Sequence, residues 1–216
     1  MTVFIGFHSL HDMNITYEFG RNVKSDQLVE IYHYSHYIPA NIQFCATEFR
    51  DNEPVAACFF SIPATRWAEP VLELCRLVRK EEVDPKPVLT TLISQAVKQI
   101  NREKKFNLLV SFADSTQGHH GGIYQACSWN FHTLRKARLD GFIINGIFTA
   151  ARTCNHRYNT SGIKLVDILK EKGIECVPHY DTGKYLYWRA LDKYGEQKAE
   201  RLGLQKQPYQ KPNVIP

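Results

Sequence analysis

An apolar run, a loop rich in glycine and histidine, and a tyrosine follow one another in the middle of the chain. The run over residues 108–113 is long enough for one buried strand and ends on the carboxylate of Asp114. The loop over residues 118–122 turns the chain, and a helix-sized segment then carries Tyr124 toward an aromatic stretch ending at Phe131. A carboxylate at a strand end and a tyrosine at a helix start can hold or move a proton, and ligands meet α/β folds at such places.

An arginine interrupts another strand pattern. Residues 71–78 alternate as a strand whose interior includes Arg76, which is unusual unless the guanidinium faces a pocket or a carboxylate. Arg76 could clamp a carboxylate, carbonyl or phosphate group of a ligand, or pair with Asp114 across neighbouring strands. Each candidate also has a structural explanation: a buried ion pair for Arg76, a turn cap for Asp114 and a place in the core for Tyr124.

The elements that must position these residues alternate between strand and helix patterns. The sequence predicts a hairpin of residues 44–49 and 55–62, and a helix over 88–103 with one apolar face. Ser25 and Asp26 can cap another helix that runs toward His36. Further strands are expected at residues 3–7, 14–19, 131–133, 142–149 and 185–191, and a further helix at 163–172.

The length of 216 residues fits one core with a modest extension. We expect a single α/β domain over residues 1–192 and a polar, basic tail over residues 193–216. The tail has few apolar residues, so it either lies on the domain or is mobile.

Composition excludes several classes of protein. The six cysteines are scattered without a CxxC pair, which indicates thiols in a reducing compartment rather than disulfides or a zinc site. No apolar stretch is long enough to span a bilayer, and we expect a cytoplasmic protein with no membrane partner. The net charge of +5 permits a nucleic-acid partner. The candidate phosphate contacts, each of which can also be merely solvated, are Arg135, Lys136, Arg138, Arg152 and Arg157.

The order of elements resembles the GNAT acyltransferase fold, a central mixed β-sheet flanked by helices. The segment over residues 123–131 is similar to the closing helix and aromatic turn of that family, where a tyrosine often protonates the leaving group. The segment after Val78 departs from the pattern, because it lacks the glycine-rich loop that cradles the pyrophosphate of coenzyme A.

A closer resemblance joins residues 73–77, 111–114 and 118–126, with His33-Tyr34-Ser35 upstream. Together they resemble the Mom family of bacteriophage DNA-modification proteins. The resemblance implies an enzyme that adds a carbamoylmethyl group, of glycinamide type, to N6 of adenine in double-stranded DNA and so protects that DNA from restriction. It implies further that Arg76, Asp114, Tyr124 and Tyr34 are important for activity, and it implicates iron.

This chemistry sets requirements for the rest of the chain. Adenine N6 is a poor nucleophile, so an enzyme must position it, accept its proton and stabilise charge on the donor. The base must also leave the stack, which requires an aromatic receptor. Tyr34, Tyr37, Trp67 and Trp129 are candidates, with a core position the more natural expectation for Trp129. For iron, the candidate ligands are His33 and His119, with Asp114 as a further member of such a site.

The group donor is the least defined part. Arg79, Lys80 and Lys86 are candidate donor contacts, and we expect a glycyl donor, such as glycyl-tRNA, rather than acyl-CoA. The alternative is a degenerate loop that binds a nucleotide thioester through backbone amides near Val88. Two other functions stay open: an ordinary GNAT N-acyltransferase that uses acyl-CoA on a small-molecule or protein amine, and a non-catalytic nucleic-acid binder. The sequence leaves the oligomeric state open, a homodimer included.

Overall fold

The computed structural model describes residues 2–4, 14–63, 67–160 and 162–209. The chain divides into two compact units. Of the described residues, the large unit comprises 2–4, 14–63, 67–112, 121–132 and 186–209, and the small unit comprises 113–120, 133–160 and 162–185.

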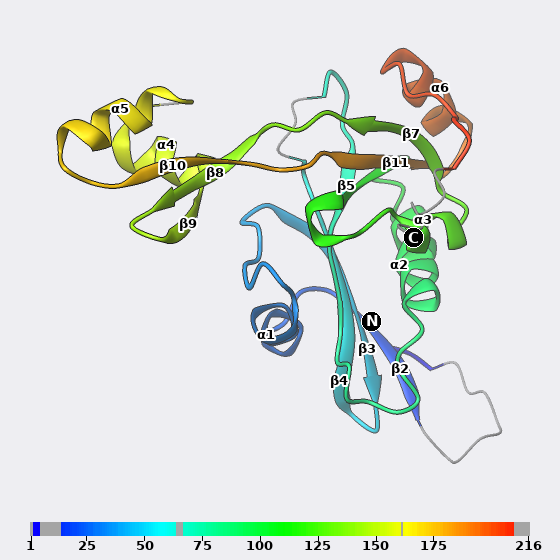
Figure 1. Cartoon of the computed structure of the whole chain (residues 1–216). Helices are drawn as coiled ribbons and strands as arrows, with labels where there is room; N and C mark the ends of the chain where they lie inside the picture. Colours follow the sequence, from blue (N-terminus) through cyan, green and yellow to red (C-terminus); the bar gives the residue numbers. More distant parts are fainter. Residues whose placement is uncertain (1, 5–13, 64–66, 161, 210–216) are drawn as a thin grey trace, which may run out of the picture. The chain divides into compact units, whose positions relative to one another are not determined.

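A mixed sheet forms the centre of the large unit (Figure 1), as the sequence predicts. Its eight strands lie in the order β1-β2-β3-β4-β5-β6-β11-β7, and β5 and β6 pair in parallel. Their bounds are β1 Thr2–Phe4, β2 Ile15–Phe19, β3 Ile42–Arg50, β4 Glu53–Ser61, β5 Leu72–Arg79, β6 Leu108–Asp114, β7 Asn130–Arg135 and β11 Lys184–Ala190. The predicted hairpin is β3 and β4, whose turn places Asp51 and Asn52 at positive φ.

Helices cover the strands of this unit. α1 (Val23–Tyr32) and α2 (Leu89–Glu103) lie on opposite sides of β3 and β4 in Figure 1. The buried face of α2 is the one that its periodicity predicts: Leu92, Ile93, Ala96, Val97 and Ile100. The 3₁₀ turn η1 (Ser115–Gln117) and the short helix α3 (Gly122–Ala126) follow β6.

The predicted cap of α1 is wrong by one turn. Asn22 is the N-cap residue, because its side chain accepts a hydrogen bond from the Ser25 N–H at 2.8 Å. The Ser25 hydroxyl accepts from the Asn22 N–H at 3.1 Å and completes a capping box. The helix ends at Tyr32, before the expected His36.

Residues 193–209, expected as part of a polar tail, lie on the large unit. Lys193–Arg201 forms the helix α6, and Ala199 and Leu204 are buried in a core cluster with Val71, Leu108 and Val110. The Trp188 indole donates to the Gln205 carbonyl at 3.0 Å. Few but well-placed apolar residues therefore suffice to hold this segment on the sheet.

The small unit has a core of its own. Its three-stranded sheet has the order β10-β8-β9, from β8 (Leu139–Ile144), β9 (Ile147–Ala150) and β10 (Cys176–Tyr180). The helices α4 (Ala151–Tyr158) and α5 (Lys164–Glu171) pack on these strands (Figure 1). The buried core residues are Phe142, Cys154, Leu165 and Leu169.

The single strand expected over residues 142–149 is instead a hairpin. Asn145 and Gly146, with φ of 49° and 80°, turn β8 back into β9. Asn-Gly is a strong signal for such a turn, because both residues tolerate positive φ.

All six cysteines carry free thiols, as the absence of disulfide spacing predicts. Burial raises the pKa of the Cys45 and Cys75 thiols to about 11 in each case. Among the described residues, no helix is long and apolar enough to cross a membrane.

Candidate active site

A β-bulge on β5 determines where Arg76 lies. Phe59 of β4 pairs with Arg76 and Phe60 with Leu74, so Cys75 is an extra residue on β5. The Cys75 thiol donates to the Phe59 carbonyl at 3.3 Å. Bulges redirect neighbouring side chains and are frequent beside active sites.

The partners of Arg76 are backbone carbonyls. Its Nε donates to the Tyr37 carbonyl at 2.8 Å, and its Nη1 donates to the Cys75 carbonyl at 2.6 Å. Among the described residues, Arg76 forms no ion pair with a carboxylate. Carbonyl groups orient the guanidinium without neutralising it, so Arg76 keeps a positive charge that can attract an anionic ligand group.

Tyr124 lies in an aromatic cluster of the large unit. Its ring centroid is 5.5 Å from that of Trp129 and 5.3 Å from that of Tyr187, and only 8% of the residue is exposed. Gly121, the N-cap of α3, has a φ of 83°, and a Cβ there would lie 2.1 Å from the Tyr187 ring. Only glycine fits this approach of helix and ring, which sets the position of Tyr124.

The hydroxyl of Tyr124 is held as a neutral donor. Burial is the largest cause that raises the pKa of Tyr124 to about 12, and Ser111 is a hydrogen-bond partner of its hydroxyl. The Ser111 hydroxyl donates its own proton to the Leu74 carbonyl at 2.7 Å, which leaves the Ser111 oxygen as an acceptor for Tyr124. Glu73 and Tyr34 lie close enough for their charges to raise the pKa of Tyr124 further.

Tyr34, the fourth predicted catalytic residue, lies on the surface of the large unit. It is 52% exposed, and its ring lies 4.4 Å from the His33 ring at an interplanar angle of 30°. His33 is 8% exposed and its Nδ1 accepts the Ser35 N–H at 3.1 Å, which fixes the imidazole under Tyr34. A flat, supported aromatic ring of this kind suits stacking with a base.

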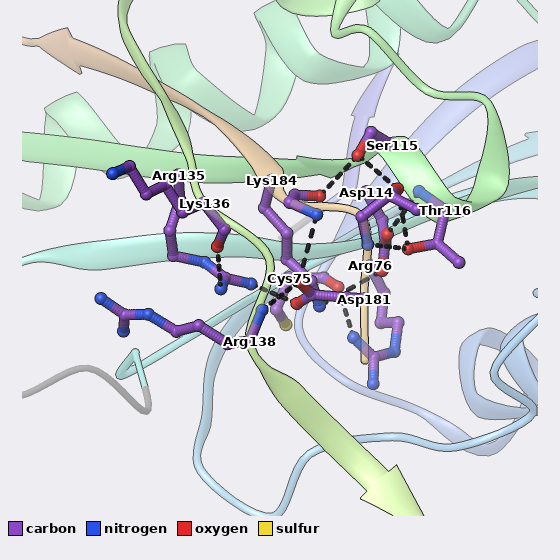
Figure 2. A network of polar contacts seen from close by, with 12 residues as sticks. Cys75, Arg76, Asp114, Ser115, Thr116, Arg135, Lys136, Arg138, Asp181 and Lys184 are labelled. Atoms are coloured by element: carbon purple, nitrogen blue, oxygen red, sulfur yellow. Dashed lines mark hydrogen bonds and ion pairs between the residues drawn. The ribbon is translucent and has the colours of Figure 1, made fainter. Parts of the chain in front are cut away.

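In the small unit, Asp114 lies at the centre of a polar network (Figure 2). Its Oδ1 accepts the Thr116 N–H at 3.0 Å, and its Oδ2 pairs with Lys184 Nζ at 3.2 Å. Asp114 thus caps the turn that follows, as one of the two sequence-based interpretations states, and it also faces a lysine that the sequence reasoning missed. The carboxylate oxygens keep further lone pairs for a ligand N–H.

Hydroxyl groups tie the end of β6 to the start of β11. The Ser115 hydroxyl donates to the Gly183 carbonyl at 2.7 Å, and the Thr182 N–H donates to Thr116 Oγ1 at 3.1 Å. These contacts hold the backbone on either side of the Asp114–Lys184 pair. The signal for them was the Asp-Thr-Gly turn directly before the last strand.

Asp181 anchors the same connection. Its carboxylate pairs with Arg135 and accepts the N–H groups of Arg138 and Gly183 at 2.9 and 3.1 Å (Figure 2). Burial raises the pKa of Asp181, but the bonds from Arg135 and the two N–H groups outweigh burial and the pKa is lowered. Arg135, a predicted phosphate contact, is therefore a structural partner of Asp181.

Of the other predicted phosphate contacts, three have side chains that the structure describes and one does not. Lys136, Arg138 and Arg157 are exposed, and among the described residues none of the three forms an ion pair. Arg152 lies within α4, but its side chain is outside the described part of the structure.

The predicted site residues are divided between the units. Arg76, Tyr124, Tyr34 and His33 belong to the large unit, and Asp114 and His119 belong to the small unit. Their convergence on one substrate stays a prediction. Among the described residues, no group of three or more His, Cys, Asp or Glu side chains is placed to hold a metal ion.

The loop between β5 and α2 does not fit the pyrophosphate of coenzyme A. Arg79 and Lys86 both pair with Glu81, at 2.9 and 2.6 Å, and Arg79, then Lys86, lowers the pKa of Glu81 to about 2. Pro85 and Pro87 lack N–H groups, and the loop contains no glycine. Two of the three basic residues predicted to hold a donor, Arg79 and Lys86, thus share one carboxylate.

The candidate stacking residues differ in their exposure. Tyr37 is 62% exposed, whereas Trp129 is fully buried and Trp67 packs against a core cluster. Tyr34 and Tyr37 remain as receptor candidates.

The model of one protein family, the Mom protein family, matches residues 20–211 of the chain. No curated protein sequence matches it. Among solved structures, the chain is similar to a ribosomal-protein-S18-alanine N-acetyltransferase from Escherichia coli, with 7% identity, a TM-score of 0.49, and coverage of 84% of this chain and 97% of that one. It is also similar to a GNAT-family putative acetyltransferase from Desulfovibrio desulfuricans, with 10% identity, a TM-score of 0.48, and coverage of 82% and 99%. A third is a Bacillus subtilis acetyltransferase in complex with CoA, with 14% identity, a TM-score of 0.47, and coverage of 82% and 98%. Identities this low carry no conclusion about activity.

Proposed function

The chain belongs to the Mom protein family, and we propose that it is a transferase that modifies adenine N6 in double-stranded DNA with a carbamoylmethyl group. The observation that carries the proposal is the family match together with its coverage, since residues 20–211 include every candidate catalytic residue. Protection of the modified DNA from restriction is the expected biological outcome.

Tyr124 is the proposed proton donor. A tyrosine with a pKa of about 12 stays protonated at neutral pH and can give its proton to a leaving group on which negative charge develops. The Ser111 oxygen orients this hydroxyl, and the charge of Arg76 stabilises an anionic donor group or leaving group.

Asp114 is the proposed acceptor for the N6 amino group. The Asp114 carboxylate, held by Lys184 and the Thr116 N–H, can accept a hydrogen bond from N6–H and align the nitrogen for attack. Tyr34 and Tyr37 are proposed to stack with the extruded base.

The proposal is tested by expressing the chain in bacteria and analysing the nucleosides of host DNA by mass spectrometry. The expected result is a heavier adenine nucleoside in cells that express the wild-type chain, reduced at least about a hundredfold by Tyr124→Phe. Soluble, folded wild-type protein without any modified nucleoside would contradict the proposed function.

We propose further that the group donor is not acyl-CoA. The support is the β5–α2 loop, in which Arg79 and Lys86 pair with Glu81 and the prolines remove amide donors. A glycyl donor, such as glycyl-tRNA, stays the prediction from the sequence. Labelled glycine fed to expressing cells should then appear in the modified adenine, and its absence there would rule this donor out.

The ordinary acyltransferase alternative predicts a different result. Saturable thermal stabilisation of the purified chain by coenzyme A would favour it, because a ligand that binds the folded state raises apparent stability.

A further inference from the structure

The helix α4 of the small unit has one buried face and one exposed polar face. Cys154 is fully buried in the core of this unit, and its thiol donates to the Thr149 carbonyl at 3.6 Å. Tyr158, one turn later, packs against the same core. The Thr153, His156 and Arg157 side chains are exposed. The helix is therefore fixed from behind and presents a hydroxyl, an imidazole and a guanidinium group to its surroundings.

The end of α4 is also fixed. The Asn155 side-chain amide, oriented so that its nitrogen faces them, donates to the carbonyls of Ala151 and Thr160 at 3.0 and 2.9 Å. These bonds tie the last turn of α4 to the connection that leads into α5. The exposed groups of α4 are thus presented on a rigid element, as a binding surface requires.

The two helices of the small unit differ in charge. α5 carries Asp167 and Glu171 beside its lysines, so its charges offset one another. α4 contains two arginines and one histidine and no carboxylate. Arg157 is exposed, and it forms no ion pair within the described part of the chain. Within the described part of the chain, the positive charge of Arg157 is therefore offset by no carboxylate, and α4 carries no acidic residue of its own.

We infer that α4 is a DNA-reading helix that enters the major groove of the duplex with Thr153, His156 and Arg157 on its groove side. An α-helix with its side chains is about 10–12 Å across, which fits the major groove with its width of about 12 Å. An arginine can form two hydrogen bonds with guanine, and threonine and histidine can contact other base edges or phosphates. The inference rests on the proposed function for the nature of the substrate and identifies the part of the chain that recognises its sequence.

Double-stranded DNA fits this surface better than other polyanions. The major groove of A-form RNA is deep and narrow and does not admit a helix. A second argument for DNA reading by α4 is that the small unit also contains Asp114 and its partner Lys184. The residue proposed to hold adenine N6 and the helix proposed to read the flanking sequence therefore belong to one compact unit.

The inference is tested by DNA binding, which does not depend on modification. The purified full-length chain is titrated by fluorescence anisotropy with a duplex of about 30 base pairs at several salt concentrations. Arg157→Gln should weaken binding about fivefold or more, and His156→Ala should weaken it by a smaller factor. The matched control is Lys170→Gln on α5, which removes one exposed positive charge from the same unit and should change the affinity less than about twofold.

The recognition of DNA sequence by α4 is measured in a separate experiment. Selection from a pool of random duplexes should give a sequence preference for the wild-type chain that Arg157→Gln relaxes at one position. Circular dichroism on every variant identifies loss of folding, and His156→Ala then serves as the second test if Arg157→Gln does not fold.

Three results would overturn the inference: equal losses from Arg157→Gln and Lys170→Gln, tighter binding to an RNA duplex of the same sequence, or no DNA binding by the wild-type chain. Retained DNA binding by α4 without modified adenine would contradict the proposed function and leave the reading helix in place. Modified adenine with unaltered binding by the α4 variants would remove the reading helix alone.

Discussion

Tyr124 of the large unit and Asp114 of the small unit are held in opposite ways. Tyr124 is surrounded by aromatic rings and by one serine, in an environment that keeps the phenol neutral. Asp114 is held by a lysine and by a backbone N–H, within a network of polar contacts. The position of the proposed acid, Tyr124, therefore depends on packing, whereas that of the proposed acceptor, Asp114, depends on polar contacts. Substitutions in the two units should therefore differ in how they affect stability and modification.

The largest loss of stability is expected where a backbone position packs most closely against a side chain. Gly121→Ala should destabilise the fold by about 3–5 kcal/mol, from the positive φ and the clash with Tyr187 together, and should abolish modification. The measurement is chemical denaturation followed by tryptophan fluorescence. Gly118→Ala is the control, because its φ is 70° but nothing lies within 4 Å of the added Cβ, and it should cost only about 1–2 kcal/mol. Equal effects of the two substitutions would show that the contact with Tyr187 is unimportant.

The second largest loss of stability is expected in the small unit. Asp181→Asn removes a buried charge that Arg135 and two N–H groups favour, and should cost about 2–3 kcal/mol. The pKa of Asp181 in the folded state is lower than its ordinary value of 3.8, so its contribution is complete above that value. The contribution is lost as pH falls through the lower folded pKa. Thermal unfolding between neutral pH and about pH 3 should therefore show a smaller pH dependence for Asp181→Asn than for the wild type.

A third prediction concerns the hydroxyl that orients the proposed acid. Ser111→Ala removes the acceptor of the Tyr124 proton and should cost about 1–2 kcal/mol, with about a tenfold loss of modified adenine. Ser115→Ala is a matched change in the small unit, where a second hydroxyl remains on Thr182. If Ser111→Ala modified DNA at the wild-type level, the proposed orientation of Tyr124 would be wrong.

The smallest effect on stability is expected at Lys184. The pair with Asp114 is partly exposed, so Lys184→Met should change the free energy of unfolding by less than about 1 kcal/mol. Modification should nevertheless fall about tenfold, because the carboxylate loses the charge that orients it. Lys184→Arg should restore most of the activity. A large loss of stability without recovery by arginine would assign Lys184 a structural role instead.

The sequence predicts the local elements well and the long-range partners poorly. The apolar face of α2 and the β3–β4 hairpin follow from spacing and turn residues within a short window. The carbonyl of Tyr37 that orients Arg76, and the lysine that pairs with Asp114, come from distant parts of the chain. The bulge at Cys75 determines where Arg76 lies on β5, whereas Tyr37 lies in the connection between α1 and β3, and no local pattern encodes their contact.

The β8–β9 hairpin shows a different reason for a wrong prediction from the sequence. Asn145 and Gly146 carry a turn signal, but the apolar residues on both sides of them predict one continuous strand. That interpretation concealed the small unit, whose core of Phe142, Cys154, Leu165 and Leu169 draws on segments that look weak one at a time.

The unpaired thiols of this chain make it a convenient subject for site-directed labelling. Burial raises the pKa of each of the six cysteines, so little reactive thiolate is present at neutral pH. A cysteine introduced at an exposed position such as His156 should react with a maleimide dye well before the native thiols do. The wild-type background can therefore carry a single fluorophore on α4 without prior removal of its own cysteines, and quenching of that dye by duplex DNA would report contact directly.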